Sequence, residues 1–85
     1  MSYELDAMPS DVRLDLRSLS ITDQEVALDV IDDLAETAES RGHVGQENVT
    51  RVVPLPDSDL LLRLRFVVDH ERQAVVVLGI AVINA

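Results

Sequence analysis

The hydrophobic and polar positions of the chain follow a helical period in its first half and a strand period in its second. Between residues 9 and 41, apolar side chains recur every three or four positions, a spacing that predicts amphipathic helices. From residue 48 onward they alternate with polar residues or run continuously, which is typical of strands. A short stretch, "YELD" at residues 3–6, precedes both regions and predicts a first strand. The predicted order of elements is therefore β-α-α-β-β-β.

Two helices are predicted in the first half of the chain. In "PSDVRLDLRSLS" at residues 9–20, Ser10 is the expected N-cap. "TDQE" at residues 22–25 is a capping box that predicts Thr22 as the N-cap of a second helix, and Gly42 is a suitable C′ residue for its end. Because only about three residues join the two, an antiparallel helical hairpin is expected. The second helix is expected to bury a stripe made of Val26, Val30, Ile31, Leu34 and Ala38.

Three strands are predicted in the second half. "NVTRVVPL" at residues 48–55 is rich in β-branched residues, and Pro54 indicates that this strand ends there or lies at an edge. "PDSD" and "DHERQ" carry turn chemistry on either side of a strand at residues 60–69, and residues 74–83 form the last strand. The pattern predicts an α+β fold, with a helical hairpin packed on one face of a small, mainly antiparallel sheet.

Composition narrows the class of protein. Eighty-five residues predict one small domain over residues 1–85, and the chain has no cysteine for disulfides or thiolate metal sites. Sixteen acidic residues against seven arginines, with no lysine, give a formal charge of −9. That charge repels phosphate backbones and anionic lipid, so nucleic-acid and membrane binding are not expected. The acidity fits either a high-salt cytoplasm or a basic partner, and no signal peptide is recognised, so a cytoplasmic location is expected.

Several residues in this order resemble the RelE/ParE superfamily of toxin proteins. "YEL" at residues 3–5 is similar to the family's first strand, and "VVVL" at residues 75–78 to its last. Between them, Arg63, Phe66 and Asp69 match positions that are common in the family's strand meander, although Leu62 stands where a tyrosine is usual. The resemblance implies a RelE/ParE-like fold, a role in a toxin–antitoxin system, and an antitoxin protein as partner.

The end of the sequence departs from the nucleolytic members of that family. Those members use basic residues on the open sheet face and a C-terminal His, Arg or Tyr, because a leaving oxygen must be protonated beside a charged transition state. Here Val82 and Ile83 occupy the corresponding positions and the given sequence ends soon after, so we expect no ribonuclease activity. The resemblance then implies action by protein–protein binding.

Candidate chemistry rests on a few side chains. Arg63 and Arg65 share one side of their predicted strand, and Arg51 is expected to join them from the neighbouring strand. They form either an anion-binding cluster or surface ion pairs with Asp59, Asp69 or helix carboxylates, and the ion pairs are favoured. His43 and His70 are expected to be exposed turn residues, and no metal site or cofactor is predicted.

The last strand is apolar on both sides, whereas two helices cover only one face of a sheet. Its second face therefore predicts a surface for a partner, unless an N-terminal segment or the 43–50 loop covers it. The expected partner-binding residues are Leu61, Val67, Val75, Val77, Ala81 and Ile83.

Three functions remain open from the sequence. The first is a RelE/ParE-like protein that binds an antitoxin or a second copy of itself without cleaving RNA. The second is an mRNA endoribonuclease toxin that uses Arg51, Arg63 and Arg65. The third is an unrelated acidic homodimer.

Overall fold

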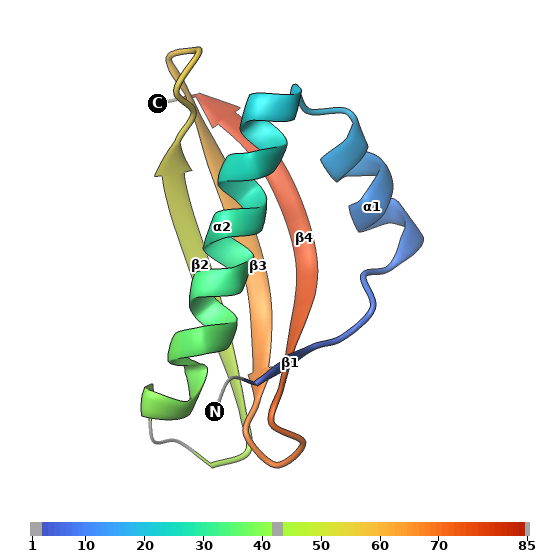
Figure 1. The fold of residues 1–85 in the computed structure, drawn as a ribbon, viewed down its shortest axis with the longest axis vertical. Helices are drawn as coiled ribbons and strands as arrows, with labels where there is room; N and C mark the ends of the chain where they lie inside the picture. The colour runs from blue at the N-terminus through green and yellow to red at the C-terminus, as the bar shows by residue number, and fades with distance from the viewer. Residues whose placement is uncertain (1–2, 42–43, 85) are drawn as a thin grey trace.

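The computed structural model describes residues 3–41 and 44–84 and has the predicted order of elements. Helices α1 and α2 follow the two-residue strand β1, and a 3₁₀ turn, η1, extends α2 before the three long strands (Figure 1). The elements are β1 (Glu4–Leu5), α1 (Ser10–Arg17), α2 (Ile21–Thr37), η1 (Ala38–Arg41), β2 (Gln46–Pro54), β3 (Leu60–Asp69) and β4 (Ala74–Asn84).

The four strands form one mixed sheet in the order β1-β4-β3-β2. The three long strands are an antiparallel meander, and β1 joins β4 in parallel, with the Asp6 amide donating to the Val75 carbonyl at 3.0 Å. Strand β2 is an edge strand that ends at Pro54, as predicted, because proline cannot donate to a further ladder bond. The antiparallel meander follows from its two short polar turns.

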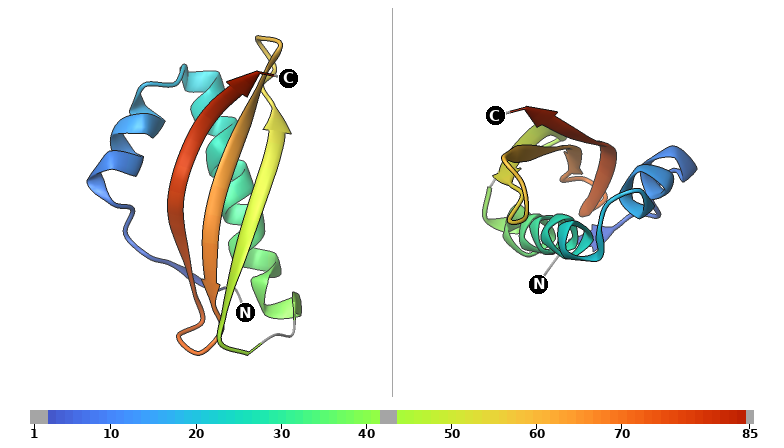
Figure 2. Two further views of the ribbon diagram at one scale, coloured as in Figure 1. Left: turned by 180° about the vertical axis from the view of Figure 1, so that it is seen from behind. Right: turned by 90° about the horizontal axis from the view of Figure 1, so that it is seen from above.

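Both helices lie on the same side of the sheet, which confirms the predicted α+β arrangement. Helix α2 lies over the long strands and contacts β4, and α1 also packs against β4 (Figure 1). Seen from behind, the strands lie in front of α2 and no helix crosses them (Figure 2). The opposite side of the sheet is therefore left without a helical layer.

The core lies between α2 and the facing side of the strands. Phe66 is its largest member and is 1% exposed. The buried face of helix α2 is slightly rotated from the predicted stripe. Val26 and Val30 are only half-buried, whereas Ala27 and Ala35 are buried. Its buried residues, with those of η1 and β3, are Ala27, Ile31, Leu34, Ala35, Ala38, Leu62, Leu64, Phe66 and Val68.

Both predicted N-caps were wrong by a short distance. Helix α1 begins at Ser10 itself, with Pro9 as the N-cap, because the fixed φ of proline suits a helix entry. Helix α2 begins at Ile21, and the Ser20 hydroxyl accepts the Asp23 amide at 3.1 Å. Ser20 thus caps the helix two residues before Thr22, and the capping-box interpretation fails. The expected C′ residue, Gly42, lies outside the described residues.

Candidate functional site

The uncovered side of the sheet, here called the open face, is defined by the strand register. Antiparallel partners lie side by side on one face, so each pair assigns two side chains together. Between β3 and β4, Leu61 pairs with Ile83 and Val67 pairs with Val76. The register places on the open face Gln46, Asn48, Thr50, Val52 and Pro54 from β2, Leu61, Arg63, Arg65, Val67 and the buried Asp69 from β3, and Ala74, Val76, Gly79, Ala81 and Ile83 from β4. The exposed Leu78 of β4 lines a hollow on this face with Thr50 and Arg65.

Arg63 and Arg65 occupy the middle of this face and are both exposed. Neither forms an ion pair or a side-chain hydrogen bond with any residue in the part of the chain that the structure describes. The ion pairs expected from the sequence are therefore wrong. Asp69 instead accepts the backbone amides of Glu71 and Arg72, both at 3.1 Å, and closes the β3–β4 turn. The two guanidinium groups remain available to a ligand.

Arg51 does not join this pair. It lies opposite Leu64, which is fully buried under α2, so Arg51 points to the helix-covered side of the sheet. The expected cluster of three arginines is wrong, because the register across the β2–β3 turn places Thr50, rather than Arg51, beside Arg65.

A β-bulge changes the expected face of the last strand. Arg65 pairs with Gly79 while Phe66 pairs with Val77, so Leu78 is an extra residue without a β3 partner. Before the bulge, Val75 and Val77 face the helices and are fully buried, which contradicts their assignment to the partner-binding face. After it, Ala81 and Ile83 lie on the open face as predicted, together with Leu61 and Val67. All four are half-buried.

The described strands of the two predicted covers belong to the sheet itself and do not lie over this face. Residues 4–5 pair along the edge of β4, and residues 46–54 form an edge strand of the sheet itself. Among the described residues, the open face is therefore formed by the strands of the sheet, and neither of these segments covers it.

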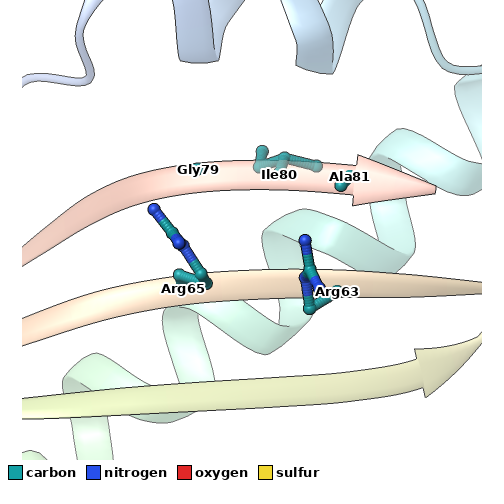
Figure 3. Close-up of a pocket in the computed structure, with 5 residues that line it drawn as sticks. All are labelled: Arg63, Arg65, Gly79, Ile80 and Ala81. Carbon is teal, nitrogen blue, oxygen red and sulfur yellow. The ribbon is translucent and has the colours of Figure 1, made fainter. Parts of the chain in front are cut away.

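Two shallow hollows flank Arg65 on the open face. One, of about 270 Å³, is lined by the two arginines with Gly79, Ile80 and Ala81. Figure 3 shows both arginine side chains leaning from β3 toward β4, beside the small residues Gly79 and Ala81. The other, of about 300 Å³, includes Thr50 and the exposed Leu78 of the bulge. Because Gly79 and Ala81 are small, a ligand on the open face can reach both arginines. Larger side chains at these two positions would fill the hollow.

A buried polar side chain, His70, lies at one end of the sheet, and no local sequence pattern indicates its burial. The His70 side chain is only 3% exposed, which contradicts its prediction as a surface residue. Its Nδ1 lies 2.9 Å from the Tyr3 hydroxyl and its Nε2 lies 3.4 Å from a Glu47 carboxylate oxygen. These contacts connect the N-terminal segment, the β3–β4 turn and β2. His43 lies outside the described residues.

The open face holds cations but no candidate acid or base. Its described residues include no His, Lys, Tyr, Cys or exposed carboxylate. No group of three or more His, Cys, Asp or Glu residues in the described chain is arranged to hold a metal ion. No helix among those described is long and apolar enough to span a membrane. The arrangement can bind an anionic group, and its described residues include no His or Tyr that could protonate a leaving oxygen.

Comparison of the chain with protein-family models, curated protein sequences and solved structures gives no significant match in any of the three. The resemblance to the RelE/ParE superfamily therefore stays a prediction from the residues.

Proposed function

We propose that the chain is a RelE/ParE-like protein of a toxin–antitoxin system that acts by binding another protein through the open face. One observation carries this proposal: both helices lie on the same side of the sheet and leave the other side of three long strands uncovered. A sheet face with half-exposed apolar pairs at each end is a typical surface for a protein partner. The β-α-α-β-β-β order and the positions of Arg63, Phe66 and Asp69 support the family assignment.

The ribonuclease alternative has weaker support. It requires three cooperating arginines and a group that protonates the leaving oxygen. Arg51 points to the helix side, and the described open face carries no His or Tyr for this proton transfer. Binding needs only the surface itself.

The test is co-expression of the chain with the product of each adjacent reading frame, followed by size-exclusion chromatography with light scattering. We expect one neighbouring product to form a stable complex with the chain and to reverse any growth arrest that the chain causes. The total RNA should show no new mRNA ends. A leucine-to-aspartate change at Leu61 on the open face should weaken the complex, whereas a change at the exposed Leu14 of α1 should leave it intact.

Two outcomes would contradict the proposal. Growth arrest with new mRNA ends that disappear in Arg63→Ala would establish the ribonuclease instead. A stable homodimer that binds neither neighbouring product would favour the unrelated acidic homodimer.

A further inference from the structure

The open face carries a charge opposite to that of the rest of the molecule. The chain has sixteen acidic residues and a formal charge of −9. Only two acidic residues lie in the three long strands, and neither exposes a carboxylate on the open face. Glu47 lies opposite Val68 on the helix side, and Asp69 is 5% exposed and holds the β3–β4 turn. Arg63 and Arg65 therefore form a local cationic surface on an acidic protein.

We propose that the open face binds an acidic segment of a partner protein, in which two carboxylates meet Arg63 and Arg65 between apolar residues. This inference rests on the proposed function, in that it identifies the chemistry of the partner at the same surface. A guanidinium group presents parallel N–H donors that fit a carboxylate in a bidentate manner. Because neither arginine is engaged by the chain's own described carboxylates, no internal ion pair has to break first.

The geometry sets the spacing of the acidic residues. Arg63 and Arg65 are two positions apart on one strand, a separation of roughly 7 Å along it. Two residues separated by one turn of a helix, or alternate residues of an extended segment, have a similar spacing. The arginines lean over Gly79 and Ala81, and a Cβ atom at Gly79 would lie 3.9 Å from Nε of Arg65 (Figure 3). A large side chain at position 79 would thus fill the hollow without breaking the sheet.

Apolar pairs lie on both sides of the arginines. Leu61 with Ile83 borders one end, and Val67 with Val76 borders the other. The two ends are separated by six residues of β3, or roughly 20 Å. The segment that fits this surface has apolar residues at its ends and two acidic residues between them.

A second copy of the chain fits this face less well. A two-fold contact between open faces would bring the arginines of both copies together, and like charges in a contact are unfavourable. A contact between the open face and the exposed acidic residues of α2, such as Asp32 and Glu36, would be head-to-tail and would assemble the copies into rings or open filaments instead of a two-fold dimer. A long nucleic acid would meet the remaining negative charge around the face.

The experiment measures fluorescence anisotropy with three labelled peptides. The first has leucines at both ends and two glutamates one helical turn apart; in the others, glutamines or lysines replace the glutamates. We expect binding of the glutamate peptide only, with an affinity that falls as salt is raised, because exposed charge pairs are screened. The double variant Arg63→Gln/Arg65→Gln should weaken binding on the order of tenfold or more.

Arg51→Gln is the control for position and is compared with the single variants Arg63→Gln and Arg65→Gln, since each of the three removes one positive charge and Arg51 lies on the other side of the same sheet. It should bind the glutamate peptide like the unmodified protein, whereas Gly79→Leu should lower the affinity by filling the hollow. Circular dichroism of each variant separates a binding defect from a folding defect. Equal binding of the glutamine peptide, an equal loss in Arg51→Gln, or displacement of the peptide by a single-stranded RNA would overturn the inference.

The two proposals fail in different ways. If a neighbouring gene product binds the chain and the complex is unaffected by Arg63→Gln/Arg65→Gln, the proposed function stands and the acidic-segment inference is wrong. If the glutamate peptide binds through both arginines but no neighbouring product does, the inference stands without the toxin–antitoxin role. Concentration-dependent growth of large assemblies, lost in the double variant, would identify the acidic α2 of another copy as the occupant and overturn the inference.

Discussion

Arg51 and Arg65 lie on adjacent strands, one residue out of register, and their side chains leave opposite faces of the sheet. Arg65 shares the open face with Arg63, while Arg51 lies opposite the buried Leu64. This relationship decides between two kinds of site. Two arginines on a strand surface whose one carboxylate, Asp69, is buried in the β3–β4 turn suit the binding of an acidic group. Three converging arginines would instead suit a phosphodiester in the course of cleavage.

The two faces of β4 before the bulge predict that an aspartate lowers the free energy of unfolding far more at Val77 than at Val76. Val77 is fully buried beneath the helices, and Val76 is half-buried on the open face. Val77→Asp should destabilise the protein by at least about 3 kcal/mol or prevent folding, because it places an unpaired charge in the core. Val76→Asp should cost about 1 kcal/mol or less. Urea unfolding followed by circular dichroism measures both, and equal losses would contradict the assignment of the two faces.

The N-cap of α2 predicts that alanine substitutions at Ser20 and at Thr22 have different effects on the free energy of unfolding. Ser20→Ala removes the side-chain acceptor of the Asp23 amide and should lower the free energy of unfolding by about 1 kcal/mol. Thr22→Ala lies inside the helix on an exposed position and should change it by less than about 0.5 kcal/mol. Thermal and urea unfolding of the two variants compare them directly. A larger loss at Thr22 would restore the capping box that the sequence suggested.

The element order follows from the sequence because it depends on local periodicity alone. The change from helical to alternating spacing near residue 48 is readable from any short window. The faces of β4 depend instead on a single extra residue. Gly79, an isolated glycine within a strand pattern, was the available signal, since such glycines often mark bulges. Strict alternation that ignores the bulge puts Val75 and Val77 on the same face as Ala81 and Ile83, whereas both valines face the helices.

Other features of the site depend on contacts that local patterns do not encode. The face of Arg51 is set by the register of the β2–β3 hairpin, in which Leu55 donates to Leu60 across the turn. The burial of His70 depends on Tyr3, which lies 67 positions earlier in the chain. A polar residue in a predicted turn is usually exposed, so only the folded arrangement identifies this contact.

The contact between Tyr3 and His70 predicts a measurable coupling. Tyr3→Phe removes the hydroxyl that lies 2.9 Å from His70 Nδ1 and leaves a buried polar atom without this partner, which should cost on the order of 1–3 kcal/mol. His70→Phe should also destabilise the protein, because Glu47 then loses its contact with Nε2. The double variant should be more stable than the sum of the single losses implies. A double-mutant cycle from urea unfolding measures this coupling, and strictly additive losses would show that the contact contributes nothing.

The excess of acidic residues predicts that salt stabilises the protein. With a formal charge of −9 on a chain of 85 residues, repulsion between like charges opposes the compact state. The screening length falls from about 10 Å near 0.1 M salt to about 3 Å near 1 M, so the repulsion should weaken over this range. Urea unfolding, in which the denaturant is uncharged, should give a free energy of unfolding that rises with added potassium chloride. The exposed α2 carboxylates provide a control: Asp29→Asn/Asp32→Asn/Asp33→Asn should raise stability at low salt and reduce its dependence on salt. A stability that stays flat or falls with salt would exclude charge repulsion as the dominant electrostatic effect and would contradict adaptation to a high-salt cytoplasm.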